Sequence, residues 1–271
     1  MYKEIKFTIK SIDGTSIPAI YAQDTARNPS KHIILLHGIS TDKNEYLNFY
    51  RILSEKLSNT NIATLRIDFR GHGDSPSSPS DFSISSQLLD LAEAIKWLEH
   101  NKKVKKISLV ASSFGAPPCL FALDIFNSKI DEITLIAPVL DYFKTFINPT
   151  TKWGRSLFKN IIPKSIIRKE KISITDKFYL SPTLVGEMLI TKIEPVIKKS
   201  DKVIKVIHGT KDSMVDFSIS KEMSKKYKNI KLFTFERMDH GFTDYDDDEG
   251  TTERTKNNID RIIKIILNLE K

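Results

Sequence analysis

The stretch of sequence that decides the fold is ISLVASSFG, residues 107–115. Its first four residues are typical of a strand buried on both faces, and residues 114–126 have the spacing of a helix. A sharp turn between a strand and a helix brings together the residues two before and two after its central residue. If Ser113 is central, those residues are the small Ala111 and Gly115, whereas the preceding serine would have two large neighbours there. The pattern predicts that Ser113 is presented at a strand–turn–helix unit.

Strand and helix patterns alternate on both sides of this unit. Apolar runs predict strands at 32–37, 62–67, 107–110, 133–136, 203–208 and 230–235. Helical spacing occurs at 45–57, 83–100, 114–126, 218–228 and 253–269. Residues 3–10 and 16–22 alternate around an Asp13-Gly14 turn and predict an opening hairpin. This succession predicts an α/β fold with a mostly parallel, eight-stranded sheet and helices on both of its faces.

Residues 141–200 break this alternation. They contain four prolines and only short helical patterns, and they are too long for a plain loop. We therefore expect a core formed by 1–140 and 201–271, with an inserted cap subdomain at 141–200. Ligand sites of open α/β sheets lie beyond the carboxyl ends of the strands. The inserted segment begins directly after one of these ends. We therefore expect the cap to cover the site.

The formal net charge of +8 is concentrated in the same segment. Lys144 to Ser200 contains 12 Lys and Arg against 4 Asp and Glu, and the rest of the chain is balanced. A charge confined to the cap gives no reason to expect a nucleic-acid partner. The sequence contains no signal-peptide pattern, no apolar run that could span a membrane, and only one cysteine, Cys119. We expect a cytoplasmic protein, either a monomer or a homodimer.

A serine hydroxyl needs a general base to act as a nucleophile, and histidine is the usual base at neutral pH. Five of the six histidines occupy strand ends, a glycine-rich turn or a helix end: His32, His37, His72, His100 and His208. His240 lies in Asp239-His240-Gly241-Phe242, between the last expected strand and the last helix. The chain order serine, acid, histidine places the base there. We predict that His240 is the base.

The acid that orients this histidine should follow an intermediate strand. Asp212 does so, directly after the strand expected at 203–208. Asp216 is the alternative, although its place just before a helix also suits an N-cap. We favour Asp212 as the acid.

Acyl transfer also needs two backbone N–H groups for the negative charge that develops on the carbonyl oxygen. One is expected at Phe114, which follows Ser113. The other is expected at Ile39, where Gly38 lets the backbone turn after a buried strand.

Five motifs carry a resemblance to a known family: His37-Gly38, Asp68-Phe69-Arg70-Gly71-His72-Gly73-Asp74-Ser75, the Ser113 turn, His208-Gly209-x-x-Asp212 and Asp239-His240-Gly241-Phe242. Together they resemble the α/β-hydrolase superfamily, and within it the small bacterial cinnamoyl and feruloyl esterase-like carboxylesterases. The resemblance covers nearly the whole chain except the cap. One departure is Ala111, where that family more often has glycine. The resemblance implies an α/β-hydrolase fold and a structural role for the turn around His72.

These residues predict a serine hydrolase that cleaves small-molecule carboxylic esters through an acyl-serine intermediate. The resemblance implies a carboxylesterase of cinnamoyl or feruloyl esterase type. The alternatives are an acyl thioesterase or acyltransferase with the same triad, and a non-catalytic binding protein of this fold. Candidate substrate contacts are the cap aromatics Phe143, Phe146 and Trp153. We expect no cofactor and no metal, because the acidic run at 244–249 lacks the ligand spacing of an EF-hand.

Overall fold

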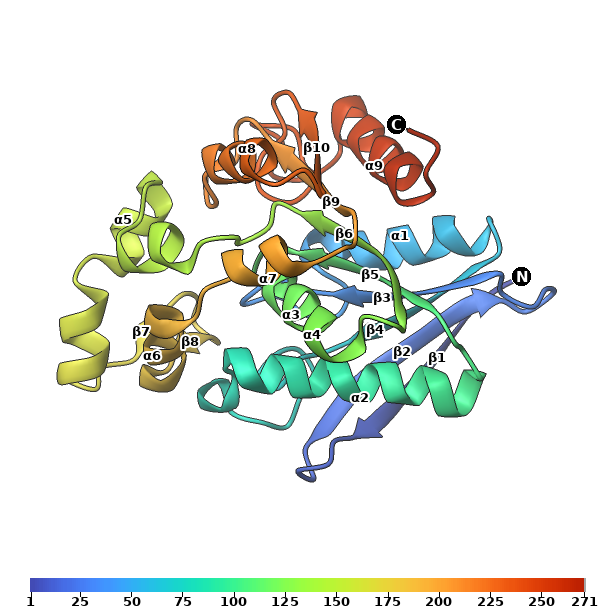
Figure 1. Cartoon of the computed structure of the whole chain (residues 1–271), viewed down its shortest axis with the longest axis horizontal. Helices are drawn as coiled ribbons and strands as arrows, with labels where there is room; N and C mark the ends of the chain where they lie inside the picture. Colours follow the sequence, from blue (N-terminus) through green and yellow to red (C-terminus); the bar gives the residue numbers. More distant parts are fainter. Residues whose placement is uncertain (271) are drawn as a thin grey trace.

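The computed structural model describes residues 1–270 and contains one sheet of eight strands (Figure 1). Its strand order is β1-β2-β4-β3-β5-β6-β9-β10. The strands from β4 to β10 in this order pair in parallel, whereas β2 pairs antiparallel with both β1 and β4. The expected eight-stranded, mostly parallel sheet with an opening hairpin is confirmed.

The strands of this sheet are β1 (Tyr2–Lys10), β2 (Ser16–Asp24), β3 (Lys31–Leu36), β4 (Ile62–Ile67), β5 (Ile107–Ser112), β6 (Ile130–Ile136), β9 (Ile204–Gly209) and β10 (Ile230–Phe235). The helices around it are α1 (Phe49–Ser58), α2 (Ile84–Lys102), α3 (Ala116–Phe121), α4 (Leu123–Phe126), α8 (Phe217–Lys226) and α9 (Glu253–Ile266). Every residue of β4, β5 and β9 is buried, as expected for strands covered on both faces.

Helices cover both faces of the sheet (Figure 1). Successive strand residues point to opposite faces, so each buried strand contributes to two core clusters. Val110 and Ile207 belong to the cluster that contains the apolar residues of α1 and α9. Leu109 and Val206 belong to the cluster that contains those of α2, α3 and α8. The central strands are therefore held from both sides, and their carboxyl ends are fixed relative to one another.

The segment between β6 and β9 is made of short elements. They are π-helical turns at Phe143–Ile147 and Pro163–Ile167, α5 (Lys152–Phe158), β7 (Ile172–Ser173), β8 (Tyr179–Leu180), α6 (Pro182–Ile190) and α7 (Glu194–Lys199). β7 and β8 form a separate two-stranded antiparallel sheet. Glu187 of α6 accepts hydrogen bonds from Ile84 N–H (2.5 Å) and Ser85 Oγ (2.7 Å), which ties the segment to the start of α2.

Two expected helices differ from the structure. The helix expected at 45–57 begins only at Phe49, because Glu45, Leu47 and Asn48 have φ values of 61°, 51° and 58° in the left-handed region. Those residues form an irregular turn ahead of α1. The helix expected at 114–126 is divided into a 3₁₀ turn at Ser113–Gly115 followed by α3 and α4.

Candidate active site

Ser113 lies in the tight turn between β5 and α3. Its φ of 48° is in the left-handed region, a conformation that costs a non-glycine residue about 1–3 kcal/mol and that tends to occur at functional sites. The turn places Gly115 directly against the end of β3, the strand beside β5. A Cβ at this position would lie 2.5 Å from the carbonyl oxygens of Leu36 and His37. Ala111, two residues before the serine, is fully buried in β5. The turn needs glycine after the serine and accepts alanine before it.

His240 and Asp212 form a hydrogen-bonded pair at the same edge of the sheet. His240 Nδ1 lies 2.9 Å from Asp212 Oδ2 and 3.1 Å from Oδ1. Asp212 follows β9, and His240 lies in the loop after β10. Asp216 instead accepts the N–H of Ser218 at 2.9 Å and caps α8. The structure thus places Asp212, and not its rival, beside the histidine.

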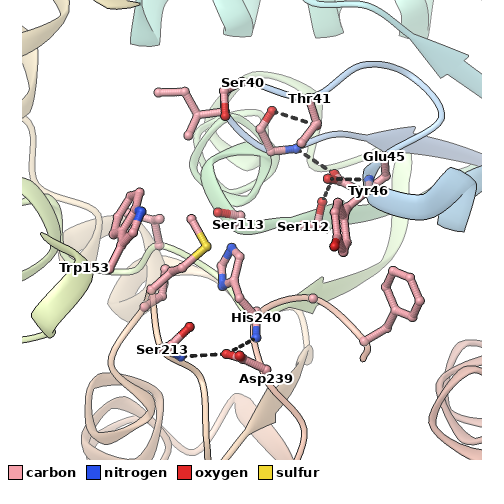
Figure 2. A pocket seen from close by; sticks show the side chains of 18 of the residues that line it. Ser40, Thr41, Glu45, Tyr46, Ser112, Ser113, Trp153, Ser213, Asp239 and His240 are labelled. Carbon is pink, nitrogen blue, oxygen red and sulfur yellow. Dashed lines mark hydrogen bonds between the residues drawn. The ribbon is translucent and has the colours of Figure 1, made fainter. Parts of the chain in front are cut away.

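Ser113 and the imidazole of His240 face the same cavity (Figure 2). Within residues 1–270 no hydrogen bond joins Ser113 Oγ to His240. Catalytic hydrogen bonds of this kind often form only when substrate is present. Because Nδ1 is taken by Asp212, the ring nitrogen that remains for the serine is Nε2.

The Asp212 carboxylate is fully buried and is held from several sides. It accepts the backbone N–H groups of Met214 (2.9 Å) and Val215 (2.8 Å). His208 Nε2 lies 3.1 Å away, and its Nδ1 lies 2.7 Å from Ser220 Oγ. Burial raises the pKa of Asp212, but the charge of His240 and the hydrogen bonds from His208 and His240 outweigh it and hold that pKa well below its usual range. The acid is therefore ionised whenever the histidine is protonated.

Sequence reasoning gave His208 no part in the site. The structure places its Nε2 within hydrogen-bonding distance of Asp212 Oδ2, the oxygen that His240 Nδ1 also contacts. The four-residue spacing from His208 to Asp212 was visible in the sequence. It carried little information, because a strand end followed by a loop does not fix which side chains face each other.

The pKa of His240 is raised above its usual value of 6.5. Burial lowers it most, but the negative charge of Asp212, the hydrogen bond to Asp212 and the charges of Glu45 and Asp239 together outweigh burial. A general base must be neutral, so a raised pKa shifts the onset of activity to higher pH.

We predict that kcat/KM for a neutral ester rises with pH through a midpoint above 6.5 and then reaches a plateau. The measurement is a pH profile of kcat/KM, with folding checked by circular dichroism at each pH. A midpoint below 6.5 in folded protein would contradict the assignment of His240 as the base.

In the loop after β3, the backbone N–H of Ile39 lies between two N–H groups that are hydrogen-bonded within the protein. Gly38 N–H donates to Glu45 Oε2 (2.8 Å), and Ser40 N–H donates to His72 Nε2 (3.1 Å). Between them, the N–H of Ile39 has no protein acceptor among residues 1–270, and the same is true of the N–H of Phe114. These are the two donors expected to stabilise an oxyanion, and both remain available to a substrate.

A cavity of about 400 Å³ opens over Ser113 and His240. This volume falls within the range of small-molecule sites. The apolar and aromatic residues that line it are Ile39, Tyr46, Phe49, Ala137, Val139, Phe146, Trp153, Met214, Val215 and Phe242. Two of the three aromatic candidates from 141–200 are therefore at the cavity. Phe143 is not among the lining residues and is 48% exposed elsewhere on the surface.

The second group that sequence reasoning missed is Glu45. Its carboxylate lines the cavity and accepts the Gly38 N–H and the Ser112 hydroxyl on the same oxygen (Figure 2). The sequence pattern predicts the start of a helix at this position. No spacing in the sequence indicates a left-handed residue at 45, so nothing pointed to a carboxylate at the site.

The sequence is similar to those of known hydrolases over slightly less than half of the chain. The family model described as alpha/beta hydrolase fold matches residues 31–160. A serine hydrolase-like protein of Dictyostelium discoideum is 32% identical over 137 residues, which are 45% of this chain and 37% of that protein. The chain thus spans little more than a third of this curated relative.

Solved structures match nearly the whole chain. Est1E from Butyrivibrio proteoclasticus with ferulic acid bound has a TM-score of 0.79 at 20% identity, covering 97% of this chain and 98% of that one. An esterase from Pyrococcus furiosus has a TM-score of 0.70 at 18% identity, covering 98% and 91%. Identities this low establish the fold alone. The chain has the α/β-hydrolase fold and resembles esterases in its structure.

Proposed function

We propose that this protein is a serine hydrolase that cleaves carboxylic esters through an acyl-serine intermediate. The observation that carries the proposal is the Asp212–His240 hydrogen bond beside Ser113, whose strained turn faces the cavity. Ser113 is the nucleophile, His240 the general base and Asp212 the acid that holds the ring. The N–H groups of Ile39 and Phe114 form the oxyanion hole.

The reaction runs in two halves. Ser113 Oγ attacks the ester carbonyl carbon while His240 Nε2 takes the hydroxyl proton, and the oxyanion accepts the two N–H bonds. His240 then gives that proton to the departing alcohol, which leaves the acyl group on Ser113. In the second half His240 removes a proton from water, the resulting hydroxide attacks the acyl-serine, and the proton returns to Ser113 as the acid departs.

The cavity favours an acyl group that is apolar or aromatic. Trp153 and Phe146 form part of its wall, and aromatic rings stack well on one another. Est1E, whose structure was solved with ferulic acid, matches this chain along its length. A cinnamoyl or feruloyl ester is therefore the acyl type that we propose. Residues 141–200, which supply Trp153, act in this proposal as a cap over the site.

The thioesterase and acyltransferase alternatives would need a cavity that accepts an anionic acyl carrier. The basic excess of 144–200 would suit anionic acyl carriers, but none of the cavity-lining residues is Lys or Arg. Several basic side chains of that segment are paired with carboxylates instead, for example Lys144 with Glu222 and Lys199 with Asp124. A non-catalytic binding protein would not need the acid, base and strained serine to converge.

The location and the oligomeric state of the protein are further parts of this proposal. No helix within residues 1–270 is both long and apolar enough to cross a membrane. A cytoplasmic location and a monomeric or homodimeric state stay predictions.

The test is a substrate panel of short and long p-nitrophenyl esters, methyl ferulate and acyl-coenzyme A, assayed with the wild type and Ser113→Ala. We expect Ser113-dependent hydrolysis of the oxygen esters, including methyl ferulate, and little with acyl-coenzyme A. Activity confined to acyl-coenzyme A would replace the esterase with a thioesterase. Ester hydrolysis that excludes methyl ferulate would remove the feruloyl type and keep the serine esterase.

A further inference from the structure

When His240 is neutral, as it must be to act as the base, the charged residues that line the cavity are all acidic. Glu45, Asp239 and Asp248 are lining residues, whereas no Lys or Arg is present among the lining residues described. A cavity that must hold a carboxylate, phosphate or coenzyme A group ordinarily offers a cation to it. The protein carries a net charge of +8, so the negative lining is not a reflection of its overall composition.

The Glu45 carboxylate is held beside the nucleophile. A Cβ added at Gly38 would lie 3.6 Å from Ser113 Oγ and 3.8 Å from Glu45 Oε2, so both groups flank the same glycine. Three donors fix the carboxylate, namely the N–H groups of Gly38 and Tyr46 and the hydroxyl of Ser112. The charge of Glu45 is also one of those that raise the pKa of His240. Its field reaches the reacting groups.

No cation within the chain neutralises this carboxylate. Among residues 1–270 no Lys, Arg or His nitrogen lies within 4.0 Å of it. Lys43, the lysine nearest in sequence, pairs with Asp68 (2.6 Å) and Asp74 (2.7 Å) instead. A half-buried carboxylate at the wall of a cavity, held by neutral donors alone, favours a positive charge in that cavity.

An aromatic ring stands next to this carboxylate. Tyr46 lines the cavity and is 48% exposed, and its hydroxyl is held by the carbonyl oxygen of Asp248 at 2.7 Å. Figure 2 shows Glu45 and Tyr46 on one side of Ser113 and Trp153 on the other. A carboxylate beside an aromatic ring is the lining that binds ammonium groups, through charge and through the ring face.

Resting on the proposed esterase function, we infer that this site takes esters that carry an ammonium group, bound against Glu45 and Tyr46 while the rest of the ester extends toward Trp153. The substrate class is an ester of an amino alcohol or of a quaternary ammonium alcohol. Neutral esters of the same shape react more slowly, and anionic ones more slowly still. The reaction remains the hydrolysis described above, with the ammonium group unchanged.

The test uses three butyrate esters of similar size and different charge: butyrylcholine, 3,3-dimethylbutyl butyrate, in which carbon replaces the ammonium nitrogen, and 3-carboxypropyl butyrate. The quantity measured is kcat/KM for each, expressed relative to the neutral ester. We expect the cationic ester to be preferred by about tenfold and the anionic ester to be disfavoured, which is the size of effect that one desolvated charge and one ring supply.

Glu45→Gln removes the charge and keeps an oxygen that accepts hydrogen bonds. We expect it to reduce the cationic preference about fivefold or more and to relieve the penalty on the anionic ester. The ratio cancels any general loss of catalysis caused by disturbing Gly38. Glu249→Gln is the matched control, because it removes the same charge from an exposed residue outside the cavity lining, and it should leave the ratio unchanged.

Tyr46→Leu provides a second readout if Glu45→Gln does not fold, and it too should lower the cationic preference. A wild-type preference for the neutral or anionic ester would overturn the inference, as would ratios that stay constant in folded Glu45→Gln or Tyr46→Leu. Hydrolysis of methyl ferulate with no hydrolysis of any of the three butyrates would also overturn the inference. The absence of Ser113-dependent hydrolysis of every ester, methyl ferulate included, would instead overturn the proposed function itself.

Discussion

Ser113→Ala is expected to reduce kcat for an ester by as much as about a million-fold, the loss found when a serine nucleophile is removed from a catalytic triad. The reason is that Ser113 combines the strained turn after β5 with a place in the cavity that the His240 imidazole also lines. Binding should survive, because the cavity wall and the two backbone donors are unchanged. The measurement is steady-state hydrolysis of a p-nitrophenyl ester, with circular dichroism to verify the fold.

Ser112→Ala is the matched control for this prediction. The Ser112 hydroxyl is next in sequence, but it donates to Glu45 and lies 3.1 Å from the Tyr50 hydroxyl. Losing one such hydrogen bond costs about 1–3 kcal/mol, so activity should fall no more than about 100-fold. If Ser112→Ala proves as damaging as Ser113→Ala, the two serines would have to exchange roles.

Asp212→Asn is expected to lower kcat by about 10⁴-fold, because an amide no longer holds the imidazole in the required tautomer. The two backbone bonds from Met214 and Val215 still have an oxygen to donate to, so the fold should persist. The measurement is kcat with the same ester, together with a thermal melt of each variant.

Asp216→Asn separates the two candidate acids. Asp216 caps α8, and asparagine is as good an N-cap as aspartate, so both stability and kcat should stay near those of the wild type. A large loss in Asp216→Asn with little change in Asp212→Asn would reverse the choice of acid.

The sheet could be predicted because a strand that is buried on both faces consists of a short run of mostly apolar residues. β4, β5 and β9 are such strands, since each of them is buried at every position. The sequence also placed Ser113, Asp212 and His240 on the carboxyl ends of three different strands. The carboxyl ends of parallel strands lie at the same edge of the sheet. The positions of the three residues along the chain were therefore enough to predict that their loops lie close together. The hydrogen bond between His240 and Asp212 could then be expected without coordinates.

Side chains that depend on irregular backbone could not be predicted. Glu45 reaches the site through a left-handed turn that replaces the expected start of a helix. His208 contacts the acid because the loop after β9 folds back on its own strand. Phe143 looked equivalent to Phe146 and Trp153, but the π-helical turn at Phe143–Ile147 leaves it exposed. In each case the local backbone conformation decides, and the amino-acid pattern does not encode it.

The central claim is that Ser113 is the nucleophile, and labelling with a fluorophosphonate probe tests it most directly. Such a probe forms a stable bond only with a serine that a general base has activated. The account predicts one probe per chain, mapped by peptide mass spectrometry to Ser113, with no labelling of Ser113→Ala and greatly slowed labelling of His240→Ala. Labelling that persists in Ser113→Ala, or that maps to another residue in the wild type, would contradict it.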